Sequence, residues 1–225
     1  MKKSLLLVLF TLAISLVIAQ PRPGKKYINF GYVSNTLTPV VDGLGNKIDF
    51  KSDFGGFYSS GKTYFLNPYP IANLLHFGID VTFIDLNYSK YKFDDLYTYE
   101  NYDTGQMLTE EESIDMHKAE VGMQVGPSVH LKIPEGLGVS VYARYAPSYS
   151  LLYQDDEFSS GFANMFTSGL TLNYKVFGVG VETRWGKTKH SFSLDIEDLA
   201  EGSDEESVKQ KFDLKGSRVF LAFRF

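Results

Sequence analysis

Residues 119–131 read AEVGMQVGPSVHL, and apolar and polar side chains alternate along the stretch. The residues on one face are apolar: Ala119, Val121, Met123, Val125, Val129 and Leu131. Those on the other face are small, polar or charged: Glu120, Gly122, Gln124, Gly126, Ser128 and His130. A period of two residues predicts a β-strand whose two faces meet different surroundings. At about 13 residues, this strand is long enough to cross a lipid bilayer at a tilt.

The same alternation recurs elsewhere in the chain. Residues 75–83, 137–145 and 177–185 each place an apolar face opposite a face of glycines and polar side chains. Pro127 removes one hydrogen bond from the strand ladder, so we predict a β-bulge at that position. Residues 53–66 form a weaker strand, whose several glycines leave its two faces unassigned.

Eight strands are predicted, at residues 26–33, 53–66, 73–86, 118–132, 137–147, 162–174, 177–186 and 216–225. The connections alternate in length. The long, polar ones are residues 34–52, 87–117, 148–161 and 187–215, and the short ones are 67–72, 133–136 and 175–176. Long outer loops and short periplasmic turns are typical of outer-membrane barrels. The expected fold class is therefore all-β: an eight-stranded antiparallel up-and-down transmembrane β-barrel with both termini in the periplasm. A soluble secreted β-barrel, with its apolar faces packed inward, is the alternative.

The start of the chain has the pattern of a signal peptide. Lys2 and Lys3 precede an apolar run over residues 5–18, and Val17 and Ala19 fit a cleavage site. The run is shorter than the roughly 20 residues of a membrane-spanning helix. We expect residues 1–19 to be removed and residues 20–225 to form the outer-membrane barrel domain. Loss of the two lysines would take the formal net charge from −5 to −7.

Composition limits the partners and the chemistry. A mildly acidic chain argues against nucleic acid as a partner, because phosphate binding needs a basic face. The chain has no cysteine, so it contains neither a disulfide nor a thiolate metal site.

The polar faces of the predicted strands place ionisable side chains inside the barrel. This predicted lumen network consists of His76, Asp80, Glu120, His130, Arg144, Glu182, Arg184, Arg218 and Arg224. Buried charges are tolerated only when they are paired, and eight strands enclose only enough space for side chains. We expect a plugged lumen. The alternative is a narrow porin-like channel for ions or small solutes, opened by an exchange of salt bridges.

The last ten residues read GSRVFLAFRF. One face carries Val219, Leu221, Phe223 and Phe225, and the final residue is aromatic. This strand resembles the C-terminal assembly signal of outer-membrane barrel proteins, which implies the barrel assembly machinery as a partner during biogenesis. With its alternating loops, the whole mature chain resembles the small eight-stranded barrels of the OmpA/OmpX type, although it matches no family-specific motif. The resemblance implies the outer membrane of a Gram-negative bacterium, in contact with lipid and lipopolysaccharide.

The sequence carries no recognisable catalytic motif. GxSxG, HExxH, a phosphate-binding glycine loop and an EF-hand loop are all missing. Four scattered histidines give no metal-binding spacing, so we expect no metal and no cofactor. Some small outer-membrane barrels modify lipid A with histidine, serine and acidic side chains near the outer rim, but nothing singles out His117 or Ser113 here. We expect no enzymatic activity, with a lipid A-modifying enzyme as the alternative.

The long connections are acidic. Residues 94–115 carry eight acidic side chains, and residues 195–206 carry seven. Such runs are usually solvated surface. A functional interpretation has them meet divalent cations at the lipopolysaccharide surface, or bind an extracellular or host protein, and protruding strands can also pair with foreign edges. The expected function is a structural or surface-interaction role in the outer membrane.

Overall fold

The computed structural model describes residues 25–40, 49–67, 69–100, 107–133, 136–154, 157–193 and 207–225. The predicted signal peptide, residues 1–19, lies outside these ranges. Among the residues described, no helix has the length and apolar character needed to cross a membrane.

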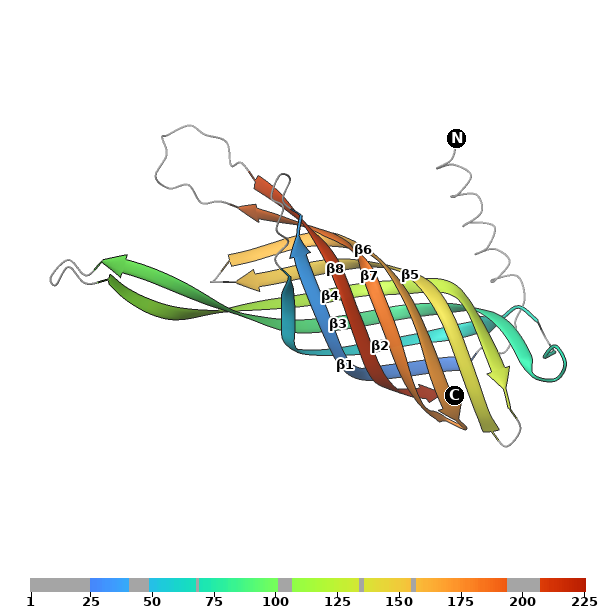
Figure 1. Ribbon diagram of the computed structural model, residues 1–225. Helices are drawn as coiled ribbons and strands as arrows, with labels where there is room; N and C mark the ends of the chain where they lie inside the picture. Colours follow the sequence, from blue (N-terminus) through green and yellow to red (C-terminus); the bar gives the residue numbers. More distant parts are fainter. Residues whose placement is uncertain are drawn as a thin grey trace.

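Eight antiparallel strands form a closed barrel (Figure 1). They are β1 (Lys25–Pro39), β2 (Phe50–Phe65), β3 (Leu75–Glu100), β4 (Met107–Lys132), β5 (Leu137–Gln154), β6 (Glu157–Tyr174), β7 (Phe177–Ser193) and β8 (Ser207–Arg224). Each strand pairs with its neighbours in the sequence, and β8 pairs with β1 to close the sheet. The predicted fold class, an eight-stranded antiparallel up-and-down barrel, is confirmed.

The two ends of the barrel differ. The turn between β6 and β7 has only two residues, Lys175 and Val176, and Lys175 adopts a positive φ of 54°. The turn between β4 and β5 is also short, and there Gly136 has φ 87°, which a glycine adopts without strain. Lys26 and Phe225 pair at this same end, where Figure 1 marks the C-terminus. We call it the short-turn end. The long strands β3 and β4 project from the opposite end (Figure 1).

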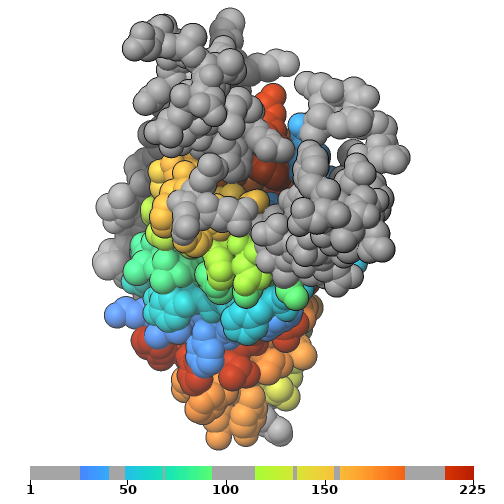
Figure 2. Space-filling model, turned by 90° about the vertical axis from the view of Figure 1, so that its left-hand side faces the viewer, coloured from blue at the N-terminus to red at the C-terminus, as the bar shows by residue number. Residues whose placement is uncertain are grey.

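The apolar side chains of the alternating strands point outward and the charged ones point inward, as a barrel in a membrane requires. The mid-strand residues Val121, Val141 and Val181 face outward and are 54%, 50% and 53% exposed. Asp80 and Arg144 are buried in the interior. The soluble alternative, with apolar faces packed inward, is therefore wrong. In Figure 2, β3, β2 (cyan), β1 (blue), β8 (red) and β7 (orange) follow one another down the outer wall in the order of their pairing.

β7 shows the height of the apolar belt on this wall. Its outward residues, in order, are Phe177, Val179, Val181, Thr183 and Trp185, followed by Lys187 and Lys189. The stretch from the first aromatic residue to Trp185 has about the length of a strand that crosses the hydrocarbon core. Aromatic residues at both margins are typical of the two membrane interfaces.

The strands extend further than predicted. Both β3 and β4 have 26 residues, so most of residues 87–117, predicted as a loop, is paired strand. The other three long loops, residues 34–52, 148–161 and 187–215, also begin and end in strand. The reason is physical: above the lipid, both faces of a strand meet polar surroundings, so the sequence loses its alternation while the main-chain ladder continues.

The predicted bulge at Pro127 is wrong. Residues on both sides of Pro127 pair with β5 in a single register, with Val125 opposite Tyr145 and Ser128 opposite Tyr142. The irregularity lies in β3 instead, between Thr82 and Asp85. Its extra residue leaves Phe83 and Ile84 both exposed on the outer wall.

An arginine at the centre of the apolar belt tests the orientation of the barrel wall. Val181→Arg is expected to lower the free energy of unfolding by about 2–4 kcal/mol, because its charge would lie near the bilayer midplane. The measurement is urea unfolding of the protein in lipid vesicles. Ser217→Arg is the control: Ser217 faces outward between Val219 and Lys215, one outward step closer to the margin of the belt, where the cost of a charge is smaller. Equal costs for the two variants would contradict the assignment of the belt.

Candidate functional site

Polar side chains from all parts of the wall fill the middle of the barrel. Eight residues of the sequence-derived network are buried there: Asp80, Glu120, His130, Arg144, Glu182, Arg184, Arg218 and Arg224. The ninth, His76, is half-buried on the inner face at the short-turn end, directly opposite His130. The structure groups most of these residues into three ionic clusters.

The first cluster surrounds Asp80 on β3. Arg144 of β5 contacts Asp80 through Nη2 at 2.6 Å from Oδ2. The hydroxyls of Thr63 and Ser128 donate hydrogen bonds to the other carboxylate oxygen, at 2.6 Å and 2.9 Å. The guanidinium also stacks on the ring of Tyr142, 3.6 Å from its centroid. A buried carboxylate is tolerated when its lone pairs are filled in this way.

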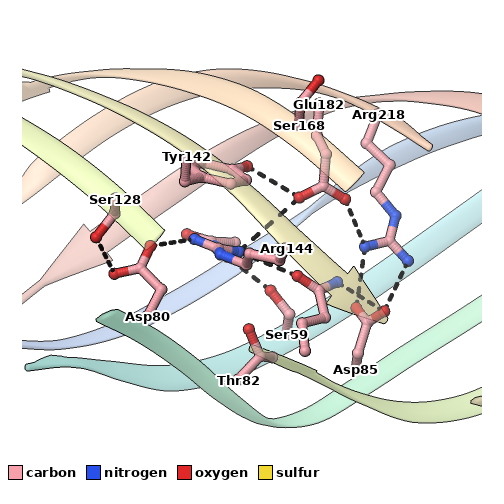
Figure 3. Close-up of polar contacts among 12 residues, drawn as sticks. Ser59, Asp80, Thr82, Asp85, Ser128, Tyr142, Arg144, Ser168, Glu182 and Arg218 are labelled. Atoms are coloured by element: carbon pink, nitrogen blue, oxygen red, sulfur yellow. Dashed lines mark hydrogen bonds and ion pairs between the residues drawn. The ribbon is translucent and has the colours of Figure 1, made fainter. Parts of the chain in front are cut away.

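The second cluster is centred on Arg218 of β8 (Figure 3). Arg218 binds both oxygens of Asp85, with Nη1 at 3.0 Å and Nη2 at 3.2 Å. Nη1 also lies 3.0 Å from Oε1 of Glu182. The Tyr142 hydroxyl donates to the second oxygen of Glu182 at 2.9 Å. A planar guanidinium that bridges two carboxylates fixes the relative positions of β3, β7 and β8 across the lumen.

Gln124 of β4 joins these two clusters. Its Oε1 accepts a hydrogen bond from Arg144 at 3.1 Å, and its Nε2 donates to Asp85 at 2.9 Å. One connected network, most of it visible in Figure 3, therefore spans the barrel: Asp80, Arg144, Gln124, Asp85, Arg218, Glu182 and Tyr142.

The third cluster lies nearer the end from which the long strands project. Glu120 of β4 accepts from Arg184 at 2.7 Å and from the Asn87 amide at 2.9 Å. Lys118 also donates a hydrogen bond to Glu120 and is fully buried. Arg184 further contacts the sulfur of Met165, at 2.9 Å.

An apolar layer fills the interior beyond this third cluster. It consists of the buried residues Leu37, Tyr91, Met116, Ala146, Leu152, Ala163, Met165, Phe212 and Leu214. Leu152 lies directly opposite Lys118 in the β4–β5 ladder, and Met116 is the next inward residue of β4. Along the barrel axis, ionic clusters are thus followed by packed hydrocarbon.

Two ionic members of these clusters were missed from the sequence. The odd-numbered residues of β3 before the bulge face outward, so simple alternation would also place Asp85 on the outer face. The bulge between Thr82 and Asp85 turns it inward. The adjacent apolar pair Phe83 and Ile84 was the available signal, since a strand facing lipid has no other reason to break its alternation. Lys118 shares the parity of Glu120, and extending the alternation by one step would have found it.

The histidines lie apart in the described part of the chain. No three or more His, Asp or Glu side chains gather there in a group that could hold a metal ion. His130 instead hydrogen-bonds the hydroxyls of Ser140 and Ser128, at 2.8 Å and 2.9 Å. His117 faces outward, 2.7 Å from the Tyr88 hydroxyl. Ser113 is the other outer-rim residue considered for lipid A chemistry. Its side chain is not among those that the structure describes.

The C-terminal strand presents its apolar face outward. Val219, Leu221 and Phe225 are exposed, and Phe223 packs against Phe30 and Phe177, with ring centroids 5.7 Å and 5.2 Å apart. β8 pairs with β7 from Ser207 to Phe223 and with β1 from Phe212 to Arg224. Whether Val219, Leu221, Phe223 and Phe225 act as an assembly signal stays a prediction.

An apolar outer belt, an ionic interior and a closed eight-stranded sheet define a transmembrane β-barrel of the outer-membrane type.

No family model matches the sequence, and neither does any protein of curated function. Several solved structures are similar in shape at low identity. The attachment invasion locus protein of Yersinia pestis, Ail, is 14% identical with a TM-score of 0.44, over 90% of this chain and 99% of its own. The outer membrane protease OmpT of Escherichia coli is 12% identical with a TM-score of 0.48, over 91% and 98%. Neisserial surface protein A is 12% identical with a TM-score of 0.38, over 90% and 100%.

Removal of the central guanidinium tests the ionic network. Arg218→Gln leaves Asp85 and Glu182 close together without their shared cation, so we expect a loss of about 3–5 kcal/mol in the free energy of unfolding. Urea unfolding in lipid vesicles measures it. The matched control is Lys187→Gln, because Lys187 is 77% exposed on the outer wall, 3.7 Å from Asp213, and should leave stability nearly unchanged. A loss no larger than the control's would show that the network is not stabilising.

Proposed function

We propose that this chain is a closed outer-membrane barrel that binds partners at the cell surface through the projecting ends of β3 and β4. The observation that carries the proposal is the length of these two strands beyond the barrel wall (Figure 1). We call the projecting part, residues 92–100 with residues 107–115, the ribbon.

Among the described residues, the two strands of the ribbon pair only with each other. The last pair between β2 and β3 is Ser52 with Tyr91, and the last between β4 and β5 is Gln154 with Met116. Beyond these points β3 and β4 pair with each other, from Lys92 opposite Asp115 to Glu100 opposite Met107. At about 3.4 Å per residue, the ribbon reaches roughly 30 Å past the wall. Both of its edges therefore lie outside the ladders of the barrel.

Such edges are suited to binding. Unpaired main-chain groups along an exposed edge accept a further strand from another protein, and the side chains provide selectivity. Residues 94–115 carry eight acidic side chains, which favours a basic partner. An outward ion pair lies at the base of the ribbon, with Lys90 Nζ 2.6 Å from Asp115 Oδ2. The hydrogen bond from Lys90 lowers the pKa of Asp115, so this carboxylate is ionised at neutral pH.

Shortening the ribbon tests this role. Replacing residues 94–113 by a two-residue turn leaves every ladder of the barrel wall intact, so the variant should still fold and keep its heat-modifiable mobility on gels. Bacteria that display the wild-type protein should adhere to matrix-coated plastic or cultured host cells several-fold better than bacteria that display the shortened variant. Surface amounts are matched with an epitope tag.

A second variant separates charge from edge pairing. Glu110→Gln, Glu111→Gln and Glu112→Gln together remove three charges and keep the length of the ribbon. A loss of adherence in this variant would assign binding to charge, and a loss only on shortening would assign it to the edges. Equal adherence of all three proteins would overturn the proposal.

The outer wall also supports contact with lipopolysaccharide. Lys187, Lys189, Lys211 and Lys215 face outward on β7 and β8, directly above the apolar belt. Lysines just outside the apolar belt are attracted to anionic headgroups at the membrane surface. This arrangement supports lipid and lipopolysaccharide as surroundings of the barrel, whereas contact with the assembly machinery and the lack of enzymatic activity stay predictions.

The interior supports a plugged lumen in preference to the porin-like channel. An ion that crosses the barrel would have to pass the Asp80–Arg144 and Arg218 clusters and then the apolar layer around Leu214. Opening such a path would break several charge-assisted hydrogen bonds at once.

Bilayer recording tests the plug. The purified protein in planar lipid bilayers should give little or no steady conductance, because ionic clusters and packed side chains fill the bore. Arg218→Gln should raise the frequency of brief openings, since it removes the bridge between Asp85 and Glu182. Large and stable open-channel currents from the wild-type protein would favour the channel.

A further inference from the structure

A pocket opens at the short-turn end of the lumen, which faces the periplasm in barrels of this class. Its volume is about 220 Å³, below the 300–1,000 Å³ typical of drug-sized ligand sites, so it suits a small ligand. The polar lining includes His76, His130, Lys132, Asn173, Lys175 and Arg224. Among the described lining residues there is no carboxylate.

Arg224 is the unusual member of this lining. It projects inward from β8 and is only 7% exposed. Its main-chain N–H donates to Val176, but its side chain makes no hydrogen bond or ion pair with any residue that the structure describes. Its Nε is buried and has no partner, and its guanidinium lies 5.6 Å from the ring centroid of Tyr27. The carboxylate that interacts with it electrostatically, Asp80, is already bound by Arg144 at 2.6 Å and by two hydroxyls.

The charges of the described interior leave Arg224 in excess. Four buried carboxylates, Asp80, Asp85, Glu120 and Glu182, are bound by four buried cations, Lys118, Arg144, Arg184 and Arg218. Arg224 is the fifth buried cation of this region. An unpaired buried charge is costly, so a guanidinium held in this way is a site prepared for an anion.

The rest of the pocket agrees with an anionic ligand. Lys132 and Lys175 lie exposed at its mouth and add positive charge. Nδ1 of His76 is buried without a partner and can donate a hydrogen bond when protonated. When cations line a pocket with low-dielectric walls, the walls concentrate the positive electrostatic field inside it.

We propose that this pocket binds a phosphate group, with the Arg224 guanidinium as a bidentate fork and with Lys132 and Lys175 at the entrance. The fork geometry of arginine matches two phosphate oxygens, and several cations around one ligand favour an anion with more than one charge. The phosphate can belong to a free periplasmic solute or to a phospholipid headgroup at the inner surface of the membrane.

Calorimetry with three phosphate probes tests the proposal. The full mature chain is folded in phosphate-free maltoside micelles and titrated separately with inorganic phosphate, glycerol 3-phosphate and glycerophosphoethanolamine. Wild-type protein should bind at least one probe saturably. Arg224→Gln should weaken that binding about tenfold or more, the effect of losing a charged hydrogen bond. Lys51→Gln, which removes an exposed lysine of β2 far from this pocket, should bind like the wild type.

The probes distinguish the two sources. Tighter binding of inorganic phosphate or glycerol 3-phosphate supports a free solute, whereas tighter binding of the phosphodiester supports a lipid headgroup. Saturable binding of none of the probes, or equal binding by Arg224→Gln, would overturn the proposal.

A second measurement uses only the wild-type protein, so its result does not depend on whether the Arg224→Gln variant folds. The Nε–Hε resonance of Arg224 in the wild-type protein, assigned through bonds, should move saturably on addition of the probe that binds in calorimetry. Arg144 and Arg218 bind carboxylates through their terminal nitrogens, so their Hε resonances serve as internal controls and should stay in place. An unmoved Arg224 resonance would also overturn the proposal.

Discussion

The pairing of β1 with β8 is the constraint on which the rest of this molecule depends. In hydrocarbon no water is available for main-chain N–H and C=O groups, so a sheet that crosses a membrane must have no free edge. Here the ladder runs from Tyr27 opposite Arg224 to Pro39 opposite Phe212. Once this ladder is closed, every strand has two neighbours across the belt, and each residue must point either to lipid or to the lumen. All the specialised features follow from that division.

Closure explains why the interior is ionic although it is buried. With apolar side chains committed to lipid, the other half of each strand carries the residues that must fill a narrow bore. Ion pairs cross the lumen and join strands that are not neighbours, as Arg218 of β8 does with Asp85 of β3. A soluble protein rarely gains from such pairs, because apolar packing would serve as well. Here they link opposite walls of the barrel, and glycines such as Gly126 and Gly161, whose added Cβ would meet main-chain oxygens of the next strand, let the strands approach closely.

Much of this architecture could be predicted because alternation depends on local sequence alone. Within the lipid belt, the faces of residues 119–131 and 177–185 are set by their own side chains. Two features depend on distant context and could not be predicted in this way. The bulge beside Phe83 exchanges the inward and outward positions of β3 and brings Asp85 inward. The continuation of β3 and β4 beyond the lipid rests on main-chain pairing, which leaves no alternation of apolar and polar residues in the sequence. The ionic partners could be placed on a face, but which carboxylate meets which guanidinium depends on the register and tilt of the whole barrel.

The position of Arg224 also follows from the depth of the lumen. Deep in the bore, near Lys118, water is excluded by the apolar layer, and there each described cation is bound to a carboxylate. Nearer the mouth the walls are open to solvent through a pocket, so a cation without a protein carboxylate can be stabilised by water or by an incoming anion. A surplus charge can therefore be kept at this end only where a ligand or water has access to it. The opposite end differs in sign, because the ribbon that projects from it is rich in acidic residues. The two ends of the barrel thus differ in chemistry: cations line the pocket at the short-turn end, and acidic residues are concentrated in the ribbon at the other.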